Sequence, residues 1–264
     1  MTHFDRTTAV DRRGADPQGP AVYDTRLDET WASLLGVHGG YVTALAVRAA
    51  QAFVPDRPVR TVSTSFLRRT EVGPAEIEVE IARSGRSFTT LLTRTRQQGR
   101  DVATARITML GPVTAPTWTS VSADRPPPLE DCVPFTPPAF ITHFANAELR
   151  LDPATIPTGD ADSSRIAGYV RPPEVRALDA AWLVVLGDWF PPSPFRRVAP
   201  PTGGISIDYV VHIHQPAPPE EVTWVAGVMT SENNVGGIAL ECGLLSTPAG
   251  APLAETFHTR WTGQ

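Results

Sequence analysis

The sequence predicts an α+β fold built from two similar halves, and two observations lead to this prediction. A single apolar helix followed by four strand-like segments occurs twice, once before residue 110 and once after residue 178. A proline-rich stretch with little potential for helices or central strands separates the two occurrences. We therefore expect an internal duplication in which each half wraps one helix with a mainly antiparallel sheet.

The first half contains a helix predicted over residues 39–54. The paired glycines Gly39 and Gly40 let the chain turn sharply into this helix and approach another group closely. Pro55 ends the helix. Apolar residues recur at the spacing of one helical face: Val42, Leu45, Ala46, Ala49, Ala50 and Phe53.

Four strands are expected to follow this helix. They are rich in Thr, Val, Ile and Phe, and glycine-containing turns separate them. The predicted strands lie at 59–69, 75–83, 87–97 and 101–110. We assign residues 1–110 to an N-terminal half.

Residues 111–160 are predicted to be a linker, because prolines crowd this stretch, among them Pro126–Pro128 and Pro137–Pro138. Residues 161–264 then repeat the first pattern as a C-terminal half. Its helix is predicted over residues 178–188. Its strands are predicted at 204–214, 222–230, 236–246 and 253–261. The turn and strand entry at 98–105 parallel those at 249–256, which supports the duplication.

Composition excludes several classes of chemistry. All 23 basic residues are arginine, so Schiff-base and pyridoxal-phosphate chemistry and phosphate-binding loops that need a lysine are excluded. The formal net charge of -5 argues against a nucleic-acid partner. The absence of a long apolar run predicts no membrane span and no signal peptide. With only Cys132 and Cys242, we expect no disulfide framework and a cytoplasmic location.

Short motifs occur in a set order in both halves. The first half contains His38-Gly39-Gly40-Tyr41-Val42, then Phe66-Leu67-Arg68, then Gly85-Arg86-Ser87. The second half contains, in order, Leu178-Asp179-Ala180-Ala181, Leu186-Gly187-Asp188, Pro191-Pro192, Ile205-Ser206-Ile207-Asp208 and His214-Gln215-Pro216. In order and spacing, these motifs resemble the TesB-like acyl-CoA thioesterases over most of residues 20–110 and 165–262.

This resemblance implies a double hotdog fold, in which two fused halves pair as a hotdog dimer does. It also implies a site in which an Asp, a Thr or Ser, and a Gln position a water against the thioester carbonyl. Matched by position, the Asp is Asp188 and the hydroxyl is Ser206. The Gln position holds His258, which departs from the family pattern.

Considered apart from the resemblance, Asp188 shares a helical face with apolar residues and lies near the helix C-terminus, where the helix dipole disfavours a carboxylate. A partly buried carboxylate there is expected to have a raised pKa and to serve as a general base. The alternative is a solvent-facing Asp on a frayed last turn.

Ser206 is expected on the polar face of its strand together with Asp208, His212 and His214. We expect it to orient a water or a carbonyl there, because no nucleophile-elbow motif surrounds it. His258 has two interpretations. In one it is a hydrogen-bonded structural residue of its strand. In the other, Asp188 fixes the tautomer of the His258 imidazole, and the Asp–His pair activates water.

The remaining candidates concern substrate and metal binding. The resemblance places His38, Gly39, Gly40 and Tyr41 beside the acyl-thioester channel, where backbone N–H groups at the helix start face the substrate. A metal site at His212 and His214 lacks a clear third ligand, so no metal or organic cofactor is expected. Because the Asp and Ser both lie in the second half, we expect one working site.

Three functions follow from these expectations. The first is an acyl-CoA or acyl-carrier thioester hydrolase that uses Asp188, Ser206 and His258. The second is a repurposed enzyme of polyketide-like biosynthesis that catalyses cyclisation or dehydration, an alternative motivated by the histidine at position 258. The third is a non-catalytic acyl-binding protein. By analogy with other fused hotdogs, we expect a homo-oligomer.

Overall fold

The computed structural model describes residues 1–14, 20–112, 114, 118–137, 141–174, 177–199, 204–214 and 223–263. Pro138, Gln215, Pro216 and Val222, which the sequence analysis used, lie outside these ranges. The described helices are α1 (His3–Thr7), α2 (Gly39–Phe53) and α3 (Ala180–Gly187). Short 3-10 helices are η1 (Glu29–Trp31), η2 (Leu129–Asp131), η3 (Thr142–Asn146), η4 (Pro153–Thr155) and η5 (Ser193–Arg196).

One antiparallel sheet of fourteen strands runs through the described part of the chain. In the first half it contains β1 (Asp11–Arg12), β2 (Ala21–Leu27), β5 (Val59–Phe66), β6 (Gly73–Ser84), β7 (Phe88–Gln97) and β8 (Arg100–Leu110). In the second half it contains β9 (Val133–Pro134), β10 (Glu148–Leu151), β11 (Ile166–Arg171), β12 (Ile205–Ile213), β13 (Val225–Thr230), β14 (Asn234–Val235), β15 (Ile238–Ser246) and β16 (Pro252–Trp261). A separate small hairpin pairs β3 (Ala32–Ser33) with β4 (Gly36–Val37).

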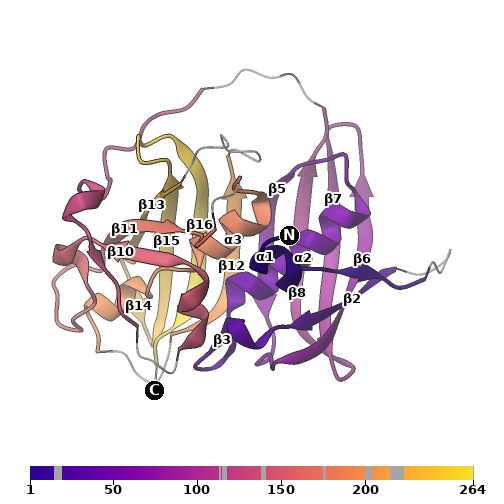
Figure 1. Ribbon diagram of the computed structural model, residues 1–264, viewed down its shortest axis with the longest axis horizontal. Coiled ribbons are helices and arrows are strands. Elements are labelled where there is room, and N and C mark those ends of the chain that lie inside the picture. Colours follow the sequence, from indigo (N-terminus) through magenta and orange to yellow (C-terminus); the bar gives the residue numbers. More distant parts are fainter. Residues whose placement is uncertain are drawn as a thin grey trace.

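The strand order confirms the duplication. Outward from the centre of the sheet, the first half runs β5-β8-β7-β6-β2 and the second runs β12-β16-β15-β13-β11. In each half, the strand after the helix is therefore central and the strand before the helix is peripheral. The halves join where β5 pairs with β12, with Thr61 opposite His212 and Ser65 opposite Asp208. The two halves lie side by side in Figure 1.

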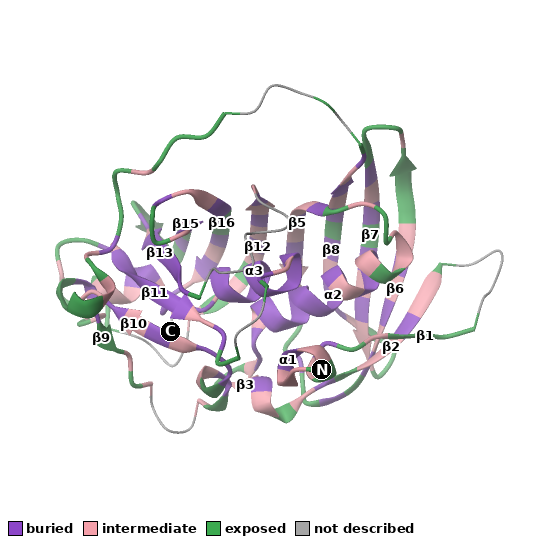
Figure 2. Ribbon diagram, turned by 45° about the horizontal axis from the view of Figure 1, so that its top comes forward, coloured by how far each residue is buried: buried purple, intermediate pink, exposed green. Residues whose placement is uncertain are grey.

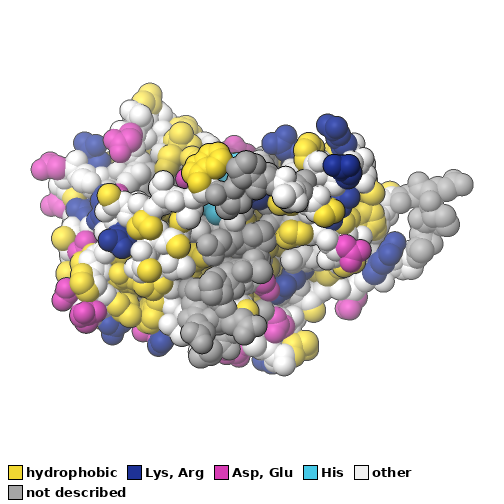
Figure 3. All heavy atoms as spheres, turned by 90° about the horizontal axis from the view of Figure 1, so that it is seen from above, with side chains coloured by type: hydrophobic (Ala, Val, Ile, Leu, Met, Phe, Trp, Pro, Cys, Tyr) yellow, Lys and Arg dark blue, Asp and Glu magenta, His cyan; other side chains and the backbone are white. Residues whose placement is uncertain are grey.

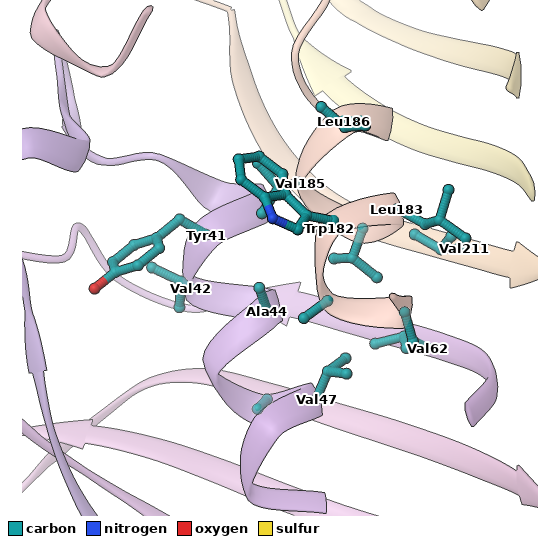
Figure 4. Packing of buried hydrophobic residues seen from close by; sticks show 14 of the residues in the cluster. Tyr41, Val42, Ala44, Val47, Val62, Trp182, Leu183, Val185, Leu186 and Val211 are labelled. Atoms are coloured by element: carbon teal, nitrogen blue, oxygen red, sulfur yellow. The ribbon is translucent and has the colours of Figure 1, made fainter. Parts of the chain in front are cut away.

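The helices α2 and α3 form the centre of the core, between the two arms of the sheet (Figure 1). All eight residues of α3 are buried, as expected for a helix that is apolar on every side. Its neighbour α2 buries ten of its fifteen residues. Figure 2 shows this burial concentrated on the two helices and the strands around them. In Figure 4, Trp182 and Val185 of α3 lie against the first turns of α2.

Both predicted core helices and eight predicted strands are present, with boundaries that differ by a few residues. The sequence analysis missed β2 and β11, the strands that precede the two helices. Within the stretch expected to be a linker, residues 133–155 contain β9, β10 and two 3-10 helices. The strand β10 pairs with β11, so this segment extends the sheet of the second half. The division at residues 110 and 161 stays a prediction.

No helix in the described ranges is long and apolar enough to cross a membrane. On the face shown in Figure 3, arginine and acidic side chains are interspersed with hydrophobic ones, and the basic groups form no continuous stripe on that face.

Candidate active site

The C-terminal end of α3 meets the N-terminal end of α2, and this contact creates the candidate site. Asp188 caps α3, and its Oδ2 accepts a hydrogen bond from the Gly40 N–H at 2.8 Å. The approach needs glycine, because a Cβ on Gly40 would lie 2.9 Å from the Asp188 Cβ. A Cβ on Gly39 would lie 3.2 Å from Asp188 Oδ2. The sequence analysis correctly expected these glycines to permit a close approach.

His38 fixes the backbone on both sides of this contact. Its Nδ1 accepts a hydrogen bond from the Tyr41 N–H at 3.2 Å, so that nitrogen carries no proton. Its Nε2–H therefore donates to the Asp188 carbonyl oxygen, 2.9 Å away. The same Nε2 lies 3.6 Å from Asp188 Oδ2. His38 is thus a neutral imidazole that caps one helix and holds the end of the other.

Ser206 reaches the site because β12 has a bulge. The pairing of β12 with β16 shifts register between Ser206 and Asp208, so that Ser206 lies opposite Arg260 and Tyr209 lies opposite His258. Skipping one residue moves a side chain to the other face of a strand. The expected placement of Ser206 on the same face as Asp208 and His212 is therefore wrong.

His258 is fully buried on β16, with the ring of Tyr209 stacked on it at 4.1 Å between centroids. Its Nδ1 lies 3.4 Å from Ser206 Oγ and 3.7 Å from Asp188 Oδ1. Its Nε2 has no hydrogen-bond partner within the described ranges. The proton is therefore best placed on Nδ1, where it faces the hydroxyl and the carboxylate. Burial lowers the pKa of His258 to about 4, so the ring is neutral at neutral pH.

Arg260 is a site residue that the sequence analysis missed. It is 4% exposed, lies two residues beyond His258 on the same face of β16, and donates from Nη1 to Ser206 Oγ at 3.0 Å. Its Nη2 lies 3.4 Å from Asp188 Oδ1. Its Nε donates to Oε1 of the buried Glu241 at 2.7 Å. The two-residue spacing from His258 is the signal that would have identified Arg260.

The carboxyl group of Asp188 differs from the sequence expectation. Burial raises its pKa, but His38, His258, Arg260 and the Gly40 N–H together outweigh burial and lower the pKa below the usual aspartate value. The predicted raised pKa is therefore wrong, because the prediction considered only partial burial and the dipole of α3. The structure places the positive N-terminus of α2 and a guanidinium beside the same carboxylate.

A cavity of about 1050 Å³ opens onto these groups and extends between the two halves. Asp188, Ser206 and Arg260 line it as one hydrogen-bonded group, and His38 and Gly39 line it as well. The other walls are mostly apolar and include Phe66, Phe135, Phe144, Trp189, Phe190 and Phe195. Arg68 and Arg69 also line it. An apolar cavity with a few convergent polar groups is the usual form of a small-molecule site.

The structure brings most, but not all, of the predicted residues to this cavity. Asp188, Ser206, His38 and Gly39 line it. His258 lies behind Ser206, and the Gly40 N–H is occupied by Asp188. Tyr41 is fully buried, with its ring stacked on Trp31 at 4.6 Å and its hydroxyl donating to the Thr7 carbonyl oxygen.

His143, on η3 of the expected linker, also lines the cavity. Its ring centroid lies 4.8 Å from that of His38 and 4.4 Å from that of Phe144. Burial, followed by the neighbouring His38, lowers the pKa of His143 to about 3, so this ring is neutral as well. The cavity therefore contains two neutral imidazoles in its wall, which sequence spacing alone did not reveal.

The other polar candidates have structural partners. His212 lies 3.2 Å from Thr61 Oγ1, and His214 pairs with Glu255 at 3.1 Å. Asp208 accepts a hydrogen bond from Ser65 at 2.7 Å. Among the described residues, no group of three or more His, Cys, Asp or Glu side chains is arranged to hold a metal ion.

Comparison with protein families gives two matches. The model of the acyl-CoA thioesterase N-terminal domain matches residues 27–110, and the model of the acyl-CoA thioesterase C-terminal domain matches residues 119–261. None of the curated proteins compared with the chain matches it.

Solved structures show the same fold. A protein of Alicyclobacillus acidocaldarius with a hot dog fold and unknown function is 23% identical, with a TM-score of 0.86 over 100% of this chain and 99% of that one. Acyl-CoA thioesterase II TesB2 of Mycobacterium marinum is 18% identical, with a TM-score of 0.77 over 99% and 97%. The tesB protein of Mycobacterium avium subs paratuberculosis is 19% identical, with a TM-score of 0.76 over 99% and 98%. The double hotdog expected from the sequence is therefore confirmed.

Proposed function

The chain belongs to the acyl-CoA thioesterase family, and from this premise we propose that it hydrolyses acyl thioesters with Asp188, Ser206 and His258 as its site. The observation that carries the proposal is the position of the Asp188 carboxylate, which lines a mostly apolar cavity together with Ser206 and shares the Arg260 guanidinium with it. The acyl group would occupy the apolar part of the cavity, with its carbonyl near this carboxylate.

Asp188 would hold the attacking water. Its Oδ2 already accepts from Gly40 and its Oδ1 faces Arg260, but a carboxylate has further lone pairs, and Asp188 lines the cavity. Because its pKa is lowered, it is ionised at neutral pH and acts as an acceptor for the proton of the water. As the new C–O bond forms and the C–S bond breaks, that proton passes to the leaving sulfur. The products are a carboxylic acid and a free thiol.

Ser206 and His258 would orient the same water. The Ser206 oxygen accepts from Arg260 and faces the Nδ1–H of His258, which leaves the hydroxyl proton to donate into the cavity. His258 presents one N–H to the site, as a glutamine amide would. This placement weakens the reason for considering a non-hydrolytic reaction, which was the histidine at position 258.

The carbonyl oxygen of the thioester needs a hydrogen-bond donor as negative charge develops on it. At the start of α2, the N–H groups of Gly40, Tyr41 and Val42 bond to Asp188 Oδ2, His38 Nδ1 and the His38 carbonyl oxygen, respectively. Among the first-turn donors described, this leaves the N–H of Gly39, a residue that lines the cavity. We assign the oxyanion contact to this group, at the positive end of the helix.

The test is release of free thiol from short, medium, long and aromatic acyl-CoAs by the wild-type protein and by Asp188→Asn. We expect the variant to lose about 100-fold or more of kcat, because an amide cannot accept the proton of the water. Asp208→Asn is the matched control, since Asp208 lies on the opposite face of β12 and bonds to Ser65. Equal loss in both variants, or no turnover by well-folded wild-type protein, would contradict the proposal.

A further inference from the structure

Arg260 and Glu241 form an ion pair inside the protein, directly behind the proposed reacting groups. Arg260 is 4% exposed and Glu241 is 1% exposed. Two guanidinium nitrogens, Nε and Nη2, each lie 2.7 Å from Glu241 Oε1. The remaining nitrogen, Nη1, donates to Ser206.

Glu241 is itself anchored, so it fixes the guanidinium in one place. Its second oxygen, Oε2, accepts a hydrogen bond of 2.5 Å from the Ser193 N–H at the start of η5. Because η5 follows closely after Asp188 in the chain, one carboxylate ties the end of β16 to the segment that leaves α3. This fixed guanidinium lies between two anions, bonded closely to Glu241 and 3.4 Å from Asp188 Oδ1.

An ion pair of this kind is costly to bury, and replacing it with apolar residues of similar size is often neutral or stabilising. Stability is therefore a weak explanation for its presence. A guanidinium at hydrogen-bond distance from a carboxylate favours the ionised form of that carboxylate. Asp188 is the carboxylate that the proposed reaction needs in its ionised form.

The other groups that face Asp188 carry no permanent charge. The imidazoles of His38 and His258 also lower the pKa of Asp188, but a histidine is charged only when it is protonated, and His258 is neutral at neutral pH. From β12, Tyr209 contributes a buried phenol whose hydroxyl donates to the Val184 carbonyl oxygen. The Gly40 N–H adds the partial charge of the α2 terminus. Within 4 Å of Asp188, Arg260 is the permanent cation among the described side chains.

We propose that Arg260, anchored by Glu241, is a positioning residue that holds Asp188 in its ionised form and fixes the Ser206 hydroxyl. Its effect on the protonation of Asp188 is independent of turnover, whereas its effect on catalysis rests on the proposed hydrolysis. The Arg260 guanidinium offsets the effect of burial on the Asp188 carboxylate, which would otherwise favour its protonated form. Asp188 therefore stays ionised beside an apolar cavity.

The experiment measures the protonation of Asp188 by carboxyl-carbon NMR of protein labelled at aspartate, with the resonance assigned by Asp188→Asn. The test variant is Arg260→Gln/Glu241→Gln, which removes both charges together, so that neither member of the pair is left as an unpaired buried ion. We expect the Asp188 midpoint to rise by about one pH unit or more, since a nearby arginine lowers an aspartate pKa by about 1 to 3 units. With acyl-CoA as substrate, the acid limb of kcat/KM should rise by the same amount.

A second variant guards against misfolding of the first, and a control variant tests whether the removal of any Arg–Glu pair shifts the Asp188 midpoint. Arg260→Met/Glu241→Leu replaces the pair with apolar groups and should give the same rise if the glutamine pair folds poorly. Arg96→Gln/Glu78→Gln removes an Arg–Glu pair between β7 and β6, outside the cavity lining, and should leave the midpoint unchanged. An unchanged midpoint in both folded test variants would overturn the inference even if hydrolysis is normal. A raised midpoint in a protein without turnover would support the inference and contradict the proposed function.

Discussion

Gly40 donates its backbone N–H to the Asp188 carboxylate at 2.8 Å, and this bond joins residues that are 148 positions apart in the chain. It places a negative charge at the positive end of α2, where a carboxylate is stabilised by the helix dipole. The same carboxylate sits at the negative end of its own helix. The site thus depends on contact between the two halves, since neither half alone supplies both the carboxylate and the helix terminus that receives it.

Gly40→Ala tests this contact. A Cβ at this position would lie 2.9 Å from the Asp188 Cβ and 3.2 Å from the Val184 carbonyl oxygen, so the two helices must move apart. We expect a loss of about 1 to 3 kcal/mol in the free energy of unfolding, as for other overpacked cores. Because the carboxylate also moves, we expect kcat to fall by about 100-fold. Urea unfolding and thiol release measure the two effects.

Gly14→Ala is the control for this substitution, because a Cβ there would meet nothing within 4 Å. It should change neither stability nor turnover. A Gly40→Ala protein with wild-type kcat would show that the close approach of α2 and α3 is unimportant for the reaction.

His258→Gln tests whether the histidine acts through its single N–H. The glutamine amide would also present an N–H toward Ser206 and Asp188, so we expect kcat within about tenfold of wild type. His258→Phe keeps the stacking on Tyr209 but removes the donor, and we expect it to lose about 10 to 100-fold. Kinetics of the two variants on the same acyl-CoA distinguish these effects. Higher hydrolysis in His258→Gln than in wild type would favour the non-hydrolytic alternative.

The fold was largely predictable because local patterns and global topology agree. The apolar stripe of α2 and the wholly apolar α3 identify the two core helices. The strands β2 and β11 were missed because each lies before its helix, outside the repeating pattern that guided the prediction. The strand β10 was missed because prolines in the same region suggested a linker, although β10 itself contains none.

The site was less predictable, because strand faces cannot be read where the alternation is broken. The β12 bulge reverses the face of Ser206, and no sequence signal marks it. On β15 the pattern is misleading, since Ile238 and Leu240 are 41% and 54% exposed while Glu241 points inward. The position of Asp188 followed from the family resemblance, but its pKa depends on α2 and Arg260, which are distant in sequence.

The buried, neutral rings of His258 and His143 make the free energy of unfolding depend on pH. The pKa is about 4 for His258 and about 3 for His143, against about 6.5 in an unfolded chain. Below pH 6.5 the unfolded state therefore binds protons that the folded state does not. The stabilising contribution is complete above pH 6.5 and is lost as the pH falls toward 4, at about 1.4 kcal/mol per pH unit for each ring.

Urea unfolding at pH 7, 6, 5 and 4.5 measures this slope. His143→Phe should reduce it by about one proton per molecule, because one buried ring no longer titrates. His3→Gln, at a partly exposed position, is the control and should leave most of the slope in place. A flat stability curve between pH 6.5 and 4.5 in wild-type protein would contradict the buried, neutral state of these rings.

The duplication also predicts one site per chain. Asp179 caps α3 as His38 caps α2, each accepting a bond from the N–H three residues later. Nine residues after His38, however, the position that corresponds to Asp188 holds Val47. In place of the paired glycines of α2, the start of α3 has two alanines.

Side chains also cover the N-terminus of α3, the position that corresponds to the cavity-facing N-terminus of α2. Arg48 of α2 pairs with Asp179 at 2.9 Å, and Phe4 of α1 stacks on Trp182 at 4.1 Å between ring centroids. Calorimetric titration with a non-hydrolysable acyl-CoA thioether should therefore give one molecule bound per chain. Asp188→Asn should keep this stoichiometry, since it removes the proton acceptor and leaves the apolar cavity intact. Two molecules bound per chain would mean that the α3 terminus opens and accepts a ligand despite the ion pair that covers it.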